Sequence, residues 1–181
     1  IMILLWLEWG PQRGAPWVWL PLALPALPLV TGQYAIALHL GIDGHYAAVL
    51  WSHLLWVLPW MLLVLQPAWR RIDPRLILTA RTLGWRRTKI FLLLKCPLLV
   101  RPALLAFATG FSVSMAQYMP TLWLGAGRFA TLTTETVALS SGGSIPILAN
   151  RALGLLLVTG TVFGLASLFS RLAGRYRQGL R

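Results

Sequence analysis

Hydrophobic positions along this chain gather into four long runs that are separated by short polar or basic segments. The runs cover about 16–40, 46–68, 97–118 and 151–171. Each is long enough for a helix to cross a bilayer, which takes about 20 mainly apolar residues. Prolines occur inside the first run, but neighbouring helices can satisfy the carbonyl groups that a proline frees within a membrane. The pattern therefore predicts an all-α fold, a polytopic transmembrane helical bundle.

The composition agrees with a membrane protein and changes the interpretation of the charge. Hydrophobic residues make up 57% of the 181 positions and charged residues 11%, too small a polar share for a soluble domain of this size. A formal net charge of +12 would suggest nucleic-acid binding in a soluble protein. Here the basic residues lie at the ends of apolar runs, where they set membrane topology. We therefore expect a lipid bilayer around the chain and no nucleic-acid partner.

Lysine and arginine are distributed unevenly between the connecting segments. The segment 41–45 has none, and 119–150 has only Arg128. The basic residues of the 69–96 loop and of the tail are Arg70, Arg71, Arg75, Arg81, Arg86, Arg87, Lys89, Lys95, Arg171, Arg175, Arg177 and Arg181. Because an even number of crossings separates this loop from the tail, the positive-inside rule places both, with the C-terminus, in the cytoplasm. Tryptophans near the predicted run ends fit an aromatic belt: Trp17, Trp19, Trp69 and Trp123.

The first 15 residues differ from the rest. "IMILLWLEWG" has seven apolar residues before Glu8, too few to span a bilayer. It also lacks the basic region and cleavage site of a signal peptide. We expect 1–15 to be the end of a truncated preceding helix with a short loop. We expect 16–181 to be the C-terminal part of a transmembrane domain, so that the chain is a C-terminal fragment.

The basic loop 69–96 carries its own helix signals. Asp73 can cap a helix that Pro74 begins, and Gly84 fits a left-handed residue at its end. The helix would place Leu76, Thr79, Ala80 and Leu83 on one face. A second short helix would run from 85 towards 95, and Pro97 would mark the entry to the third run. From the residues alone, this helix–turn–helix is either an interfacial pair that binds anionic lipid headgroups or a docking element for a cytoplasmic partner.

The loop resembles the signature loop of binding-protein-dependent ABC transporter permeases (MetI-like type). That pattern is Glu-Ala-Ala, three residues, Gly, nine residues, then Ile-x-Leu-Pro. Ala80, Gly84, Leu94 and Pro97 fall on the second Ala, the Gly, the Ile and the Pro, with the nine-residue gap kept. The departures are Leu78 and Thr79 for the Glu and the first Ala, and Cys96 for the Leu. The wording "ARTLGWRRTKIF" is similar to the iron(III)/thiamine-type branch, and the resemblance covers roughly 16–175.

The resemblance implies a transporter subunit that catalyses no reaction and needs no cofactor. A separate ABC ATPase dimer would hydrolyse ATP at the cytoplasmic face, and the 69–96 loop would be the coupling helix seated in it. An extracytoplasmic substrate-binding protein and a second permease domain would complete the importer in the bacterial inner membrane. The implied coupling residues are Leu76, Thr79, Ala80, Leu83, Gly84, Trp85, Leu94 and Pro97. The implied substrate is thiamine-like, with iron(III), sulfate and molybdate as alternatives.

Histidines support a different reading, a small integral-membrane enzyme that uses His39, His45 or His53. Against it, no histidine–acid cluster falls on one span or at one depth. His39, Asp43 and His45 match no strong zinc spacing, so we expect no metal site. We expect His53 to be neutral and bonded to a neighbouring helix. No GxxxxGK[ST] arrangement is present, so the energy source must lie on another chain.

Three further features bear on transport. The third run has a polar side that would line a substrate path or bond to neighbouring helices, made of Ser112, Ser114, Gln117 and Tyr118. We expect Glu135 to be a solvated acid in a loop. The alternative is that Glu135 contacts a substrate-binding protein or a cationic substrate. The pair Gly160 and Gly164 has the spacing of close helix contacts, and we expect it to pack within this bundle and not between permease domains.

Overall fold

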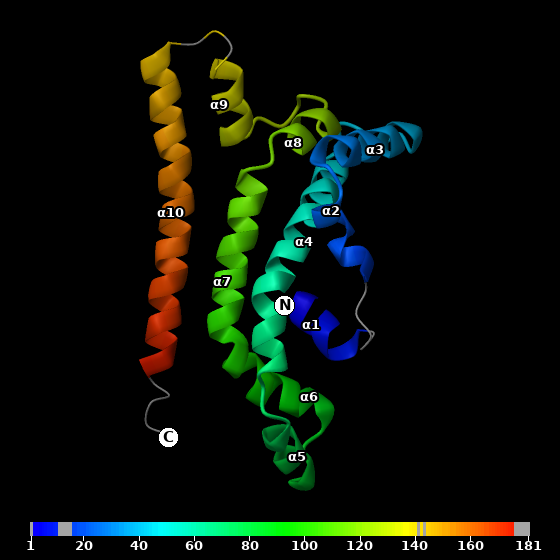
Figure 1. Ribbon diagram of the computed structural model, residues 1–181, viewed down its shortest axis with the longest axis vertical. Helices are drawn as coiled ribbons and strands as arrows, with labels where there is room; N and C mark the ends of the chain where they lie inside the picture. Colours follow the sequence, from blue (N-terminus) through cyan, green and yellow to red (C-terminus); the bar gives the residue numbers. More distant parts are fainter. Residues whose placement is uncertain (1, 11–15, 141, 143, 176–181) are drawn as a thin grey trace.

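The computed structural model describes residues 2–10, 16–140, 142 and 144–175 (Figure 1). Every regular element in these ranges is a helix, which confirms the all-α prediction. The expected short loop within 11–15, the tail arginines Arg177 and Arg181, and residues 141 and 143 lie outside the described residues.

Three helical segments among the described residues are long and apolar enough to cross a membrane. They are α4 (Tyr46–Arg70), the stretch Arg87–Met115, and Ile145–Leu172 within α10 (Ile145–Arg175). The stretch 87–115 comprises α6 (Arg87–Ile90), the π-helical turn η2 (Phe91–Lys95) and α7 (Cys96–Met115). Figure 1 shows α10, α7 and α4 running side by side along the long axis, with α7 packed against both of the others. These helices agree with a polytopic membrane bundle.

The first expected span, 16–40, is broken in two. The first part comprises the turn η1 (Pro16–Trp19) and α2 (Leu20–Ala23), and the second part is α3 (Ala26–His39). The chain bends by 116° between the two parts. Leu24 has an extended backbone, φ −93° and ψ 147°, because the ring of Pro25 disfavours the helical region for the residue before it. Pro25 then caps α3, where its missing N–H costs nothing. The sequence interpretation treated this proline as tolerated inside one helix, and the structure places the break there.

The third expected span begins earlier than 97. The helix starts at Arg87 and continues into α7, so the expected second short helix of the loop and the span form one shaft. Pro97 lies in the first turn of α7 and does not interrupt the shaft. Because Pro97 has no N–H to offer to the preceding turn, the hydrogen-bond register widens just before it, and Cys96 N–H bonds to the Phe91 carbonyl in η2.

The long outer segment contains two helices that sequence reading missed, α8 (Met119–Leu124) and α9 (Leu132–Ser140). Hydroxyls begin α9: the N–H of Thr134 donates to Thr131 Oγ1 at 3.2 Å, and the N–H of Thr131 donates to Thr134 Oγ1 at 2.8 Å. This reciprocal pair is a capping box. Gly125 ends α8 in a buried position, so this end of the helix is packed against the rest of the molecule.

Close helix packing occurs at a glycine other than the expected pair. A Cβ added to Gly110 of α7 would lie 2.7 Å from Met61 Sδ and 3.0 Å from Val57 Cγ1 of α4. A Cβ added to Gly160 or Gly164 would have no atom of the described residues within 4 Å, and both glycines are exposed there. The packing of Gly160 and Gly164 within this bundle therefore stays a prediction that the described residues do not show. Gly110 lets α4 and α7 approach closely instead.

Candidate functional site

The basic loop folds as its sequence signals predict at both ends of α5 (Pro74–Thr82). Asp73 Oδ1 accepts a hydrogen bond from the N–H of Arg75 at 2.8 Å, and Pro74 occupies the first helical position. At the other end Gly84 has φ +74°. The N–H of Gly84 donates to the Arg81 carbonyl at 2.9 Å, and that of Trp85 to the Ala80 carbonyl at 3.0 Å. These two bonds form a Schellman turn, so the predicted cap and left-handed residue are both confirmed.

The apolar side chains of α5 lie open on the described surface. Leu76 is 46% exposed, Leu83 is 69% exposed, and only Ala80 on their face is buried. Of the eight predicted coupling residues, Leu76, Thr79, Leu83 and Gly84 are exposed, while Trp85, Leu94 and Pro97 are half-buried. Leu94 and Pro97 belong to the shaft below the turn and not to α5. In Figure 1, α5 projects from one end of the bundle beyond the spans.

A buried ionic cluster lies at the base of this loop, and sequence reading missed it. Glu8 of α1 (Met2–Trp9) has a side chain only 5% exposed. Its Oε1 accepts from Arg87 Nε at 3.0 Å, and its Oε2 pairs with Lys95 Nζ. Arg87 also donates to the Glu8 backbone carbonyl. Nothing in the local pattern near residue 8 points to partners about 80 positions away, although a lone acid in an apolar helix is itself a signal of a buried partner.

Aromatic side chains surround the charges of this cluster. The guanidinium carbon of Arg87 lies 5.5 Å from the ring centre of Trp9, and Lys95 Nζ lies 4.7 Å from that of Trp69. Trp9 in turn meets Phe91 edge to face, with ring centres 5.0 Å apart. Rings at these distances attract cations. The pair of Glu8 with Lys95 is shielded from water, whereas the Arg87 side chain is 52% exposed, so its pair with Glu8 is the more screened of the two.

A second polar cluster lies inside the bundle around His53 of α4. His53 Nδ1 is 2.8 Å from Ser114 Oγ, and Nε2 is 2.8 Å from Thr121 Oγ1. The Thr121 hydroxyl donates to the Gln117 carbonyl at 2.7 Å, so Thr121 Oγ1 is left to accept from Nε2–H. Nδ1 then accepts from Ser114. A neutral imidazole satisfies every one of these bonds, as the sequence predicted for His53.

Buried polar atoms without a protein partner extend this cluster. Gln117 Nε2 donates to the His53 carbonyl at 3.3 Å, but its Oε1 has no hydrogen-bond partner. Ser52 donates to Gln33 Oε1 at 3.0 Å, and Gln33 Nε2 is likewise unmatched. The Trp56 indole N–H is the third such group among the described residues. Two donors and one acceptor are therefore available in the apolar part of the molecule, where unmet polar groups are costly.

A groove of about 290 Å³ opens beside two of these atoms. Its lining residues are Ala26, Leu27, Val30, Trp56, Ala116, Gln117, Tyr118, Met119 and Pro120. Of the four predicted path residues, Gln117 and Tyr118 line the groove and Ser114 bonds to His53 next to it. Ser112 donates to the Ala108 carbonyl of its own helix at 2.9 Å and is not brought to the groove wall.

The histidines of the enzyme alternative do not assemble a site among the described residues. His45 Nδ1 lies 3.1 Å from the Asp43 carbonyl oxygen, not from its carboxylate. Within residues 2–10, 16–140, 142 and 144–175, no group of three or more His, Cys, Asp or Glu side chains is placed to hold a metal ion.

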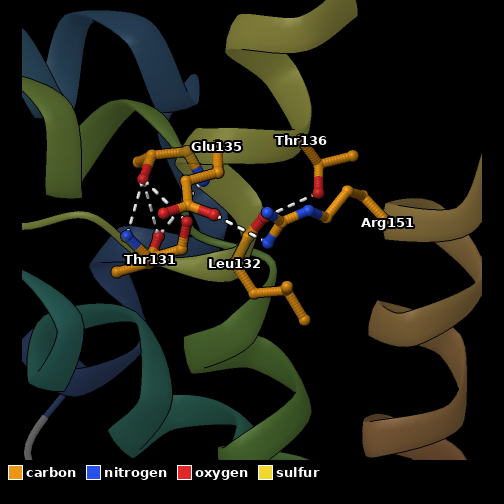
Figure 2. A network of polar contacts seen from close by, with 6 residues as sticks. Thr131, Leu132, Glu135, Thr136 and Arg151 are labelled. Atoms are coloured by element: carbon orange, nitrogen blue, oxygen red, sulfur yellow. Dashed lines mark hydrogen bonds and ion pairs between the residues drawn. The ribbon is translucent and has the colours of Figure 1, made fainter. Parts of the chain in front are cut away.

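Glu135 is not a loop acid, contrary to the sequence interpretation. It lies in α9, and its Oε2 pairs with Arg151 Nη1 of α10 at 2.8 Å (Figure 2). The capping box at Thr131 and Thr134 creates a helix where a loop was expected, and α9 packs beside α10. Both charged side chains remain nearly half exposed, 44% for Glu135 and 46% for Arg151, so the pair ties the two helices only weakly.

Comparison with known proteins supports the resemblance drawn from the loop. All 181 residues align, at 65% identity, with the inner membrane ABC transporter permease protein YnjC of Escherichia coli (strain K12). The chain spans 35% of the length of that protein. No protein-family model and no solved structure matches the chain. Over its full length, the chain is thus similar to about a third of an inner membrane ABC transporter permease.

Proposed function

We propose that this chain is the part of an ABC importer permease that receives motion from a separate ATPase through α5 and its turn. The proposal is supported most by one observation: a capped helix with exposed leucines projects from the end of the bundle. Exposed apolar side chains ringed by arginines suit a protein groove, which buries the leucines and pairs the charges. The relative's name adds that a protein of similar sequence is an ABC transporter permease in an inner membrane.

The shaft 87–115 is the mechanical part of this proposal. Its 29 residues form one helical stretch of about 40 Å, at 1.5 Å per residue. The loop turn lies at its start, and Ser114, which bonds to His53, lies at its end. Force applied to α5 therefore reaches the intramembrane polar cluster through one helix. ATP binding and hydrolysis would take place on the partner ATPase dimer, and the two positions of the shaft would be the two states of the path.

The substrate path, in this proposal, passes the groove beside Gln117 and Tyr118. Polar groups inside a membrane protein mark such paths because facing lipid would be costly for them. The unmatched atoms of Gln117 and Trp56 offer an acceptor and a donor to a passing solute. No residue that lines the groove is charged, so this wall by itself favours neither anions nor cations. A thiamine-like substrate, iron(III), sulfate and molybdate therefore remain equivalent candidates at this wall.

The remaining parts of the proposal concern topology and partners. The basic loop and the C-terminus would lie in the cytoplasm of a bacterial cell with the ATPase, according to the positive-inside rule. Residues 1–15 would end a preceding helix, and 16–181 would be the C-terminal part of the transmembrane domain. A substrate-binding protein would contact the face opposite the cytoplasm, and a second permease domain would lie beside this one in the membrane.

Co-purification of an ATPase with the full-length protein tests the proposal. The test variant is Leu76→Asp with Leu83→Asp, which places charge on the exposed apolar face of α5. The matched control is Thr82→Asp, an exposed position of α5 on another face. An ABC ATPase that accompanies the wild type and the control, and is lost from the double variant, would support coupling through α5. If no ATPase accompanies the wild type, or if the double variant retains it fully, the proposed function is wrong.

A further inference from the structure

Helix α1 is joined to the base of the loop by charge and to the bundle by apolar packing, in which Ile3 lies buried with Leu62, Leu65 and Ala106. On one side Glu8 bonds to Arg87 and Lys95, the first residue of α6 and the last of η2. On the other side, side chains of α1, η1 and α4 surround an apolar cavity of about 230 Å³, lined by Ile3, Trp6, Val18, Leu58 and Leu62. This cavity leaves the packing of α1 on α4 incomplete beside the buried contact of Ile3 with Leu62.

Glu8 pairs with two cations that lie at opposite ends of one helical segment. Arg87 and Lys95 lie eight positions apart, at the two ends of 87–95, the first part of the shaft after the loop turn. One carboxylate therefore holds both ends of the segment that contains the π-helical turn. Phe91 is the first residue of that turn, and its edge-to-face contact with Trp9 adds an aromatic contact between α1 and η2.

Stability alone is a poor reason for such a cluster. Removing a carboxylate and an ammonium group from water is costly, and well-packed apolar residues commonly stabilise a buried site as well or better. What a buried ion pair provides is a defined geometry, since its partners must meet at bonding distance. The burial of Glu8, 5% exposed, and of Lys95, 12% exposed, therefore favours a role in alignment.

We propose that Glu8 is a positioning residue that fastens α1 to the base of the coupling loop, so that α1 and the segment 87–95 move as one body. The inference rests on the proposed function, because it assumes that an ATPase displaces α5. Displacement of the loop would then travel along two routes, the shaft 87–115 and helix α1. The contact that must yield in such a movement is the packing of α1 on α4, which the apolar cavity leaves incomplete.

Distances between spin labels in the full-length protein, bound to its ATPase in lipid nanodiscs, test this directly. Labels at Leu5 and Leu93, both exposed, report α1 against η2, and labels at Leu5 and Leu63 report α1 against α4. Each pair is measured without nucleotide and with ATP and vanadate. The expected result is an unchanged Leu5–Leu93 distance and a shifted Leu5–Leu63 distance. A wild type in which the Leu5–Leu93 distance shifts while Leu5–Leu63 stays constant overturns the inference.

Variants then identify the carboxylate as the cause. Glu8→Gln should broaden the Leu5–Leu93 distribution and make it depend on nucleotide, whereas Glu135→Gln, which removes the exposed pair with Arg151, should leave it unchanged. Combining Glu8→Gln with Lys95→Met should add no further broadening, since both changes break one contact. If Glu8→Gln is poorly folded, the double variant Arg87→Met with Lys95→Met serves, because it removes both cations and leaves α1 unchanged. A narrow, nucleotide-independent distribution in these variants refutes the inference.

Failure of the proposed function and failure of the role of Glu8 give different experimental results. If ATPase binding to the wild type is absent, the proposed function falls and this inference falls with it. If the ATPase binds and α1 stays fixed to α4, only the role of Glu8 is lost.

Discussion

Replacing Gly84 by valine should weaken ATPase binding without removing any contact. Gly84 has φ +74°, and a Cβ there would have no atom within 4 Å, so the substitution causes no clash. Its cost is backbone strain, about 1–2 kcal/mol for a side chain in the left-handed region. That is a factor of about 5–30 in the population of the Schellman turn. If only the intact turn binds, the apparent affinity falls by as much as the same factor.

The assay is a binding titration of the purified ATPase against the full-length protein in detergent, with Gly84→Asn and Gly127→Val beside Gly84→Val. Asparagine tolerates the left-handed region, so Gly84→Asn should lose less affinity than valine. Gly127 has φ +70° and equally open surroundings, but it follows α8 at the other end of the molecule. Gly127→Val should therefore carry a similar strain and leave the affinity unchanged.

Equal weakening by Gly84→Val and Gly127→Val would refute the reasoning, because a general loss of stability would then explain the effect. Unchanged affinity in Gly84→Val would refute it as well, since the turn would not be needed for docking. A valine variant that binds less tightly than the asparagine variant, with an unaffected control, is the expected pattern.

Three further changes test the packing by thermal unfolding in detergent. Gly110→Val should destabilise the protein by about 1–3 kcal/mol through overpacking against Met61, and an unchanged midpoint would contradict the close contact of α4 and α7. Ala126→Gly should stabilise it by about 1 kcal/mol, because Ala126 has φ 48°; a lower midpoint would show that the strain is not there. Glu135→Gln should cost less than about 1 kcal/mol, since its pair with Arg151 is nearly half exposed; a larger loss would mean that this pair is not solvent-screened.

Local signals in the sequence predict the loop well because each acts within a few residues. Asp73 caps the helix that begins at the next residue, and Gly84 ends it by its own backbone preference. The same locality explains one error. Pro25 acts on Leu24 directly, and that local effect, which breaks the first span, outweighs the general tolerance of membrane helices for proline.

Features that depend on distant residues were not predictable in this way. The spacing of Gly160 and Gly164 suggests a close contact, yet Gly110, which has the small residues Ala106 and Ser114 four positions away on either side, makes the contact with Met61. Which glycine faces a neighbouring helix depends on the rotation of each helix about its axis. That rotation cannot be deduced from the local pattern of a single sequence. The pairing of Glu8 with Lys95 is likewise set only when α1 reaches the shaft. The polar residues in and just after α7 were predictable as a group, but only their partners on α4 and α8 show that Ser114 and Gln117 form the cluster and Ser112 does not.

Because of the π-helical turn Phe91–Lys95, the direction in which the loop points depends on the number of residues in this segment. A wide turn of this kind amounts to one residue added to an α-helix, and one residue corresponds to a rotation of about 100°. Deleting a single residue within 91–95 would restore an ordinary helix and swing α6 and the exposed leucines of α5 by about that angle around the shaft. The direction in which the leucines of α5 face a partner therefore depends on the number of residues in this part of the shaft. A change in that number would rotate α5 about the shaft even if every side chain of α5 were kept.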